Sequence, residues 1–302
     1  MAEETQTQAA PIVPDVAPEE IADGVYVIPD HRINLVPNIG IITGERAVLV
    51  VDTGMGPRNG ERVLEKAREV ADRRPLYLTL THFHPEHGFG AQAFVPEVPL
   101  FYNRTQRDEL AQKGEAFIEM FRTFGPDVAE QLEGVELVMP QIVYEEAAEV
   151  DLGGRTVHLR HYGQAHTFGD QVAWLPEERI LFAGDLVENR FFPILPDEGS
   201  SGRLWISVLA LLEGLGPETV VPGHGEVGDA GLIRDAREYL SAVRSLVHER
   251  HRAGQGLEEM KAELEPEIRE RWADWDNEIW IGFATENFYG DLARTKPSAG
   301  GL

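Results

Sequence analysis

The stretch from Leu78 to Gly90, LTLTHFHPEHGFG, places three histidines and a glutamate within six residues, directly after an apolar run. The whole chain of 302 residues has only ten histidines, so this cluster is unusual. Residues two apart in an extended segment project to the same side, and a proline suits the first position of a helix. We therefore expect a strand that turns into a helix over PEHGFGAQAF. The turn would present four candidate metal ligands in two pairs, His82 with His84 and Glu86 with His87.

Three further candidate ligands lie beside apolar runs elsewhere in the chain. His166 lies in the turn GQAHTFGD, Asp185 ends the run RILFAGD, and His224 follows the run TVVPG with a glycine on either side. Loop positions next to strands line the active-site edge of the sheet in α/β proteins. The chain has no cysteine, so nitrogen and oxygen donors must hold any metal.

Short β-rich runs and helical stretches alternate along the chain. Apolar spacing predicts helices over residues 58–74, around 104–124 and over about 229–252, with further helix in the C-terminal stretch, broken at Pro266. Two strand-rich, helix-bearing halves in succession predict an α/β fold of four layers, αββα, in which two sheets lie face to face. A doubly wound sheet is the alternative. We expect a disordered tail over 1–20, a catalytic domain over 21–252 and a helical C-terminal extension over 253–302 packed on the core.

The formal net charge of −25 limits the kinds of partner. An acidic surface repels nucleic acid and anionic lipid, so we expect neither as a partner and expect a small-molecule substrate instead. No apolar segment approaches the length of a bilayer span, and the first residues lack the pattern of a secretory signal. The expected location is therefore the cytoplasm. The aromatic-rich C-terminal helices are expected to pack on their own core; a lid over the site or a homodimer face are the alternatives.

The order of these motifs resembles the metallo-β-lactamase-fold hydrolase superfamily. HxHxEH comes first, followed by His166, by Asp185 after an apolar strand, and by a final Gly-His; VVDTG at 50–54 and AGD at 183–185 match accessory motifs. The resemblance covers roughly residues 21–245. It implies a dinuclear site, with zinc expected and iron or manganese as alternatives. It further implies that His82, His84 and His166 bind the first metal, that Glu86, His87 and His224 bind the second, and that Asp185 bridges them.

Glu86 departs from the family pattern, which has aspartate at this position. The extra methylene moves the carboxylate by about one bond length, against a tolerance of about 0.2 Å for metal–ligand distances. We expect Glu86 to remain a ligand, with a shifted or more weakly held second metal. Asp52 in VVDTG has two interpretations: it accepts the N–H of a ligand histidine, or it is a turn aspartate bonded to nearby backbone.

Two divalent cations that share a water can lower its pKa to about 7. The expected function is therefore a metal-dependent hydrolase, β-lactamase-like or lactonase-like, in which a metal-bound hydroxide attacks a carbonyl. Glu86 and Asp185 are the expected catalytic residues, because they can position the nucleophile and relay its proton. A glyoxalase-II-like thioesterase and a mononuclear iron oxidoreductase of the persulfide-dioxygenase type are the alternatives. Arg190 could pair with the carboxylate of a β-lactam, and Phe191, Phe192 and Trp205 could form a pocket wall, although ordinary packing is the favoured interpretation.

Overall fold

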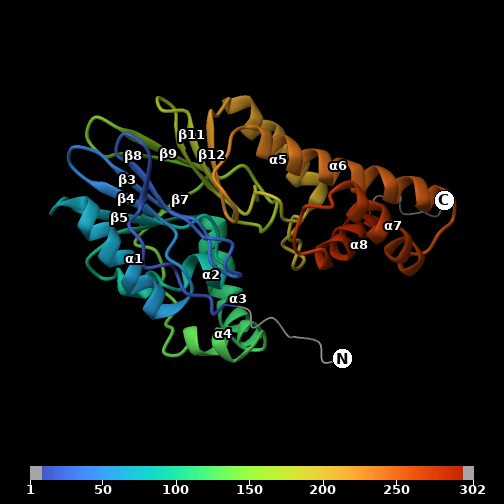
Figure 1. Ribbon diagram of the computed structural model, residues 1–302, viewed down its shortest axis with the longest axis horizontal. Helices are drawn as coiled ribbons and strands as arrows, with labels where there is room; N and C mark the ends of the chain where they lie inside the picture. The colour runs from blue at the N-terminus through green and yellow to red at the C-terminus, as the bar shows by residue number, and fades with distance from the viewer. Residues whose placement is uncertain (1–8, 295–302) are drawn as a thin grey trace, which may run out of the picture.

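The computed structural model describes residues 9–294. Its strands form a seven-stranded sheet, β1 to β7 in sequence order, and a five-stranded sheet in the order β12-β11-β10-β9-β8 (Figure 1). The strands of the first sheet are β1 (Glu19–Ala22), β2 (Val25–Ile28), β3 (Ile39–Thr43), β4 (Val48–Val51), β5 (Leu76–Thr79), β6 (Leu100–Asn103) and β7 (Ile142–Tyr144). Those of the second are β8 (Ala147–Asp151), β9 (Thr156–Arg160), β10 (Val172–Leu175), β11 (Ile180–Gly184) and β12 (Thr219–Pro222).

Eight α-helices and one 3-10 helix accompany the strands in the described part of the chain. They are α1 (Gly56–Ala71), α2 (Pro85–Gly88), η1 (Ala91–Ala93), α3 (Arg104–Arg122), α4 (Pro126–Gln131), α5 (Gly202–Leu215), α6 (Gly231–Arg252), α7 (Leu257–Arg271) and α8 (Ile279–Arg294). Strands β4 to β7 pair in parallel, as do β11 and β12, and the remaining pairs are antiparallel. In the parallel part, the carboxyl ends of neighbouring strands meet at one edge, where loop residues can form a site.

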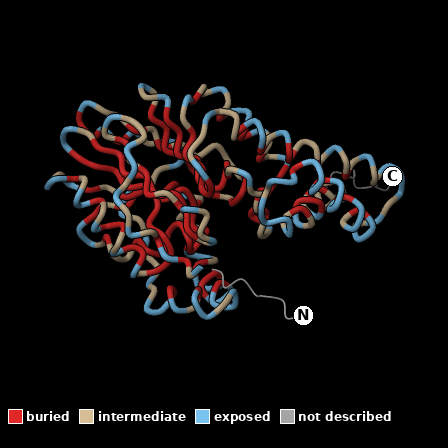
Figure 2. The backbone as a smooth tube through the Cα atoms, in the orientation of Figure 1, coloured by how far each residue is buried: buried red, intermediate tan, exposed pale blue. Residues whose placement is uncertain are grey.

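Three apolar clusters separate four layers. One lies between the first sheet and helices α1 to α4, one between the two sheets, and one between the second sheet and helices α5 to α8. Strand β4 shows how the sequence achieves this: Val48 and Val50 belong to the first cluster, and Leu49 and Val51 belong to the cluster between the sheets. Both faces of such a strand are buried, which explains its unbroken apolar run. The expected αββα sandwich is confirmed, and buried segments concentrate in its sheets (Figure 2).

The C-terminal helices pack alongside α6, as Figure 1 shows. The expected break at Pro266 is absent, because α7 continues through this residue. Met260, Leu264 and Ile268 recur every four residues on one face of α7 and are all buried. The free energy gained by burying these three side chains outweighs the cost of the backbone hydrogen bond that a proline removes inside a helix.

The N-terminal segment is also better packed than expected. Residues 1–8 of the expected tail lie outside the described residues, but from residue 9 the chain lies against α1. The Val13 amide donates a hydrogen bond to Asn59 Oδ1 at 2.8 Å, and Asn59 Nδ2 donates to the Pro11 carbonyl at 2.9 Å. Val13 is buried, and β1 already begins at Glu19. The expectation of disorder up to residue 20 was therefore wrong for residues 9–20, because a polar composition rich in proline and alanine does not reveal that Val13 is buried with its backbone amide paired.

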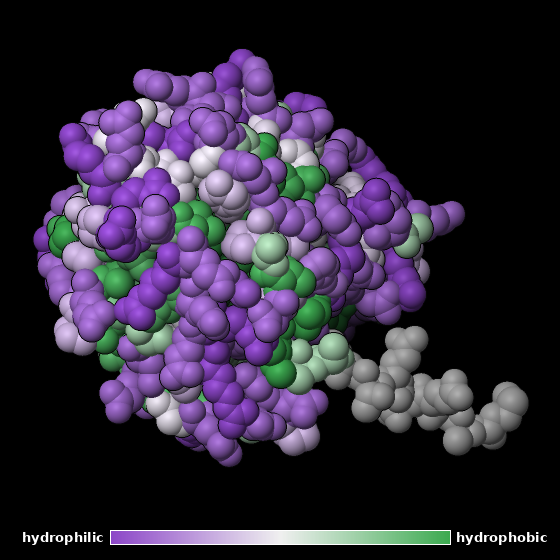
Figure 3. All heavy atoms as spheres, turned by 60° about the vertical axis from the view of Figure 1, so that its left-hand side comes forward, coloured by the Kyte–Doolittle hydropathy of each residue, from purple (hydrophilic) through white to green (hydrophobic). Residues whose placement is uncertain are grey.

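Hydrophilic side chains cover much of the surface, with hydrophobic ones gathered in patches (Figure 3). Within residues 9–294, no helix combines the length and the apolar character that crossing a membrane would require.

Candidate metal centre

The histidine-rich turn follows β5, as expected. His84 is the extended residue before α2, and Pro85 is the first residue of that helix. The helix is a single turn that ends at Gly88, and η1 follows separately, so the helix expected over PEHGFGAQAF is not continuous. Gly90 lies between the two helices, and a Cβ there would lie 2.7 Å from the Thr53 carbonyl oxygen and 2.8 Å from Gly60 Cα. The turn therefore lies directly against the start of α1.

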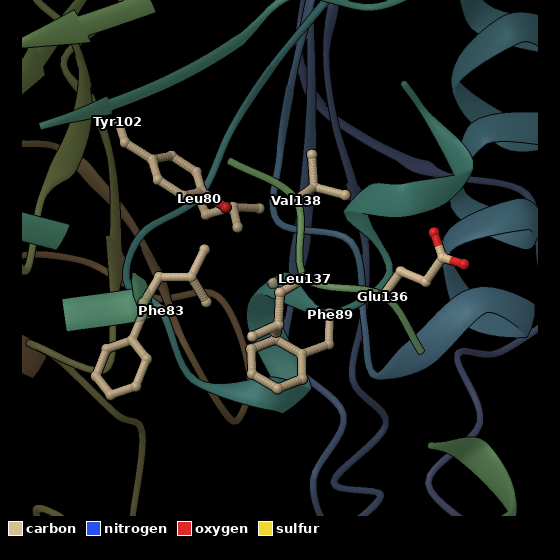
Figure 4. A pocket seen from close by; sticks show the side chains of 9 residues that line it. Leu80, Phe83, Phe89, Tyr102, Glu136, Leu137 and Val138 are labelled. Carbon is tan, nitrogen blue, oxygen red and sulfur yellow. The ribbon is translucent and has the colours of Figure 1, made fainter. Parts of the chain in front are cut away.

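Apolar side chains support the turn from behind (Figure 4). Leu80, Phe83, Phe89 and Tyr102 are buried around a void of about 10 Å³, close to the space of one water molecule. Dense packing of this kind transmits displacement rather than absorbing it. The ligand candidates on the turn are therefore held on a rigid support.

All seven expected ligands meet at one edge of the two sheets. They form two groups whose candidate ligand atoms lie within 4.8 Å of one another: His82, His84 and His166 in the first, and Glu86, His87, Asp185 and His224 in the second. Every one of the seven is buried. The two groups are those that the resemblance implied for the two metals.

Asp185 lies between the two groups. Its Oδ2 faces the first group, 3.9 Å from His82 Nε2 and 3.7 Å from His166 Nε2. Its Oδ1 faces the second group, 3.1 Å from His87 Nε2 and 3.7 Å from His224 Nε2. The geometry suits a carboxylate that gives one oxygen to each of two cations.

Backbone carbonyls orient two of the histidine rings by accepting a hydrogen bond from the ring nitrogen Nδ1. His166 Nδ1 donates to the Ile194 carbonyl at 2.7 Å, and His224 Nδ1 donates to the Val36 carbonyl at 2.9 Å. Such bonds fix the tautomer so that the other ring nitrogen, Nε2, is free to bind a metal.

Asp52 combines both of its interpretations. Its Oδ2 lies 2.8 Å from His87 Nδ1, and its Oδ1 accepts the Thr81 backbone N–H at 2.7 Å. The Thr81 hydroxyl donates to the same carboxylate at 2.8 Å. Asp52 therefore orients a ligand histidine and also fixes the backbone of the turn.

The donor set fits a pair of cations. The buried atoms without a hydrogen-bond partner include Nε2 of His82, Oε2 of Glu86 and Oδ2 of Asp185. Leaving so many polar atoms unpaired is costly unless a further group compensates them. His84 Nδ1 and His166 Nε2 lie 3.0 Å apart, near the roughly 3.3 Å that two nitrogen ligands of one tetrahedral zinc would show.

Burial and neighbouring charges shift the pKa values of the candidate ligands. Burial lowers the pKa of His82 and His84 well below the ordinary histidine value, which keeps both rings neutral. Burial raises the pKa of Glu86 to about 7. For His87, burial acts to lower the pKa, but the Asp185 and Asp52 carboxylates outweigh it and hold the pKa well above the ordinary value.

Sequence reasoning missed Glu188, three residues after Asp185. This carboxylate is buried, and neither oxygen has a hydrogen-bond partner. Burial raises its pKa well above the ordinary value, and repulsion from Asp185 adds to the effect. The neighbouring Asn189 amide donates to the His224 carbonyl at 2.9 Å, which ties this turn to the second group of ligands. One sequence feature could have indicated Glu188: it follows Leu186 and Val187, directly after the apolar run that ends at Asp185.

The expected pocket residues have other roles. Arg190 is 3.7 Å from Asp274 Oδ2, and Phe192 and Trp205 are buried in the apolar cluster beneath the second sheet. Phe191 lies beside His224, with ring centroids 6.2 Å apart. The guanidinium carbon of Arg32 lies over the Phe191 ring, 4.4 Å from its centroid. Packing was thus the correct interpretation for Phe192 and Trp205.

Comparison with known proteins agrees with this geometry. The human acyl-coenzyme A thioesterase MBLAC2 is 26% identical over 247 residues, which cover 74% of this chain and 87% of that protein. The metallo-beta-lactamase type 2 of Bacillus cereus is 23% identical over 212 residues, covering 68% of this chain and 73% of that protein. The structure of the sec-alkylsulfatase Pisa1 from Pseudomonas sp. superposes with a TM-score of 0.71 at 16% identity, covering 93% of this chain and 52% of that one. The sequence model of the metallo-beta-lactamase superfamily matches residues 33–224. The chain therefore belongs to the metallo-beta-lactamase superfamily.

Proposed function

We propose that the protein is a hydrolase that holds two zinc ions and cleaves a neutral acyl ester or thioester. The observation that carries this proposal is the position of the two ligand groups at one wall of a pocket of about 690 Å³. His84 from the first group and Glu86 from the second both line this pocket. A substrate bound there would place its carbonyl against both groups.

The ligand set suits zinc, which accepts imidazole and carboxylate donors. Bound there, a zinc pair would supply Lewis acidity and a water that ionises near neutral pH. Asp185 would hold both ions, because its Oδ2 faces the first ligand group and its Oδ1 faces the second. Asp52 would keep the His87 ring in the tautomer that binds a metal. Glu86 and Asp185 would position the attacking water and accept its proton.

A β-lactam substrate has less support than an ester or thioester. Arg190 faces Asp274, and among the described residues no lysine or arginine lines the pocket. A β-lactam carboxylate would therefore enter a chain of net charge −25 without a lysine or arginine side chain to receive it. The similarity to a protein named as an acyl-coenzyme A thioesterase supports the thioester reading.

Metal analysis combined with a substrate panel tests the proposal. The purified protein should contain two equivalents of zinc and should hydrolyse a p-nitrophenyl ester and an acyl thioester faster than a chromogenic cephalosporin. Removal of the metal by a chelator should abolish turnover, and added zinc should restore it. His224→Gln should lose the second equivalent, whereas the control His158→Gln, in β9 and outside both groups, should keep it. One equivalent of iron with no turnover of any ester or thioester would refute the proposal.

A further inference from the structure

The pocket beside the ligands is built from parts of the chain that are far apart in sequence. Its walls come from the C-terminal end of α3, from α4, from the loop around Ile194, from residues 9–11 and from α8. Its volume of about 690 Å³ lies within the range of small-molecule sites. Its size and its place next to His84 mark it as part of the substrate site.

A row of aromatic rings leads from the ligands along one wall. The His84 ring stacks on Phe117 at 5.1 Å between centroids, Phe117 lies 6.3 Å from Phe121, and Phe121 lies 4.8 Å from Phe124. Their spacing of four and three residues places these phenylalanines on one face of α3 and its C-terminal end. The row forms a continuous apolar surface from the centre outwards.

The opposite wall comes from α8. Trp280 and Phe283 line the pocket with their ring centroids 4.9 Å apart, and Ile279 lies beside them. The aromatic residues of the C-terminal helices thus divide between two roles. Trp272 and Phe288 are buried in the apolar core, as expected, whereas Trp280 and Phe283 face the pocket.

The pocket also concentrates exposed apolar surface. Eight large hydrophobic side chains are exposed among the described residues, and half of them line this one pocket. They are Met120, Phe124, Ile279 and Phe283. Contiguous apolar surface of this kind marks a binding site for an apolar ligand. Because no lysine or arginine of the described chain lines the pocket, the ligand part bound there carries no negative charge.

We propose that this pocket binds a linear aliphatic chain of the substrate, with the scissile carbonyl at His84 and Glu86 and the chain lying along Phe117, Phe121 and Phe124 towards α8. This assignment rests on the proposed hydrolase function and specifies its substrate class: esters or thioesters of aliphatic acids rather than short or charged acyl groups. Transfer of each methylene from water into an apolar site corresponds to an affinity gain of about fourfold.

A chain-length series tests the assignment. KM should fall by about two- to fourfold per added methylene across p-nitrophenyl esters from acetate to decanoate. Phe124→Asp and Phe283→Asp, on opposite walls, should each flatten this dependence. Leu211→Ala, an exposed apolar residue of α5 outside the pocket, is the matched control and should leave the series unchanged. Titration of the wild type with decan-1-ol by calorimetry should show binding that Phe124→Asp weakens at least tenfold.

Failure of this assignment can be told from failure of the proposed function. If the wild type hydrolyses neither an ester of the series nor an acyl thioester, the hydrolase proposal fails. The aliphatic-chain pocket is refuted if the wild type hydrolyses the acetate ester but KM is the same for all chain lengths. It is also refuted if both aspartate variants keep the wild-type dependence of KM on chain length and the wild-type affinity for decan-1-ol.

Discussion

Gly223 packs directly against the Asp185 carboxylate, so its replacement by alanine should damage the candidate metal centre. An added Cβ would lie 1.9 Å from Asp185 Oδ1 and within 2.9 Å of the Asp185 amide nitrogen. Real Cβ contacts essentially never fall below 3.0 Å, so the alanine Cβ and Asp185 Oδ1 must move apart by about 1.1 Å, through a shift of the carboxylate, of the backbone at residue 223, or of both. Metal–ligand distances tolerate only about 0.2 Å. The displacement is therefore several times larger than a metal site accepts.

We expect Gly223→Ala to lower zinc affinity by at least about 10- to 100-fold, the range seen when groups that orient ligands are lost. Overpacking should also reduce the free energy of unfolding of the metal-free protein by about 1–3 kcal/mol. Zinc competition with a chromophoric chelator and thermal melts with and without zinc measure the two effects separately. Gly214→Ala is the matched control, because an added Cβ in that part of α5 meets nothing within 4 Å. Two zinc equivalents held at wild-type affinity in Gly223→Ala would show that the reasoning is wrong.

Substitutions at three other positions should report on the site and on its surroundings. Glu86→Asp should strengthen binding of the second zinc, because it introduces the shorter aspartate side chain of the family pattern. Unchanged zinc affinity in a competition titration would mean that the glutamate carboxylate already reaches the metal. Glu188→Gln should raise the free energy of unfolding of the metal-free protein at neutral pH by about 1 kcal/mol or more. Burial raises the pKa of Glu188 well above the ordinary value, so folding must protonate a carboxylate that is charged in the unfolded chain, and glutamine removes this cost. Denaturant unfolding after chelation measures the change, and a loss of stability would contradict it. Asn103→Ala should cost about 1–2 kcal/mol, since Asn103 Oδ1 caps α3 by accepting the Gln106 N–H at 2.9 Å. Asn103→Asp keeps the capping oxygen and should lose less stability than Asn103→Ala, although it loses the hydrogen bond that Asn103 Nδ2 donates to the Gly169 carbonyl. Equal losses of stability in the two variants, measured by thermal melts, would argue against the cap.

The sequence by itself determined which histidines and carboxylates are the candidate metal ligands, and the structure brings all seven to one edge of the two sheets. Histidine and carboxylate positions next to apolar strand ends depend on local pattern, and parallel strands bring such ends to one edge of a sheet. The layered fold could also be predicted, because unbroken apolar runs such as β4 require burial on both faces.

Only the tertiary structure decided what surrounds that centre. The carbonyl partners of His166 and His224 belong to Ile194 and Val36, which no local pattern connects to the histidines. The pocket likewise joins α3 to α8, so Phe124 and Phe283 became neighbours of one cavity only through long-range packing. Side chains of this kind look like ordinary core residues in sequence, because whether an apolar residue packs or lines a cavity depends on the elements opposite it.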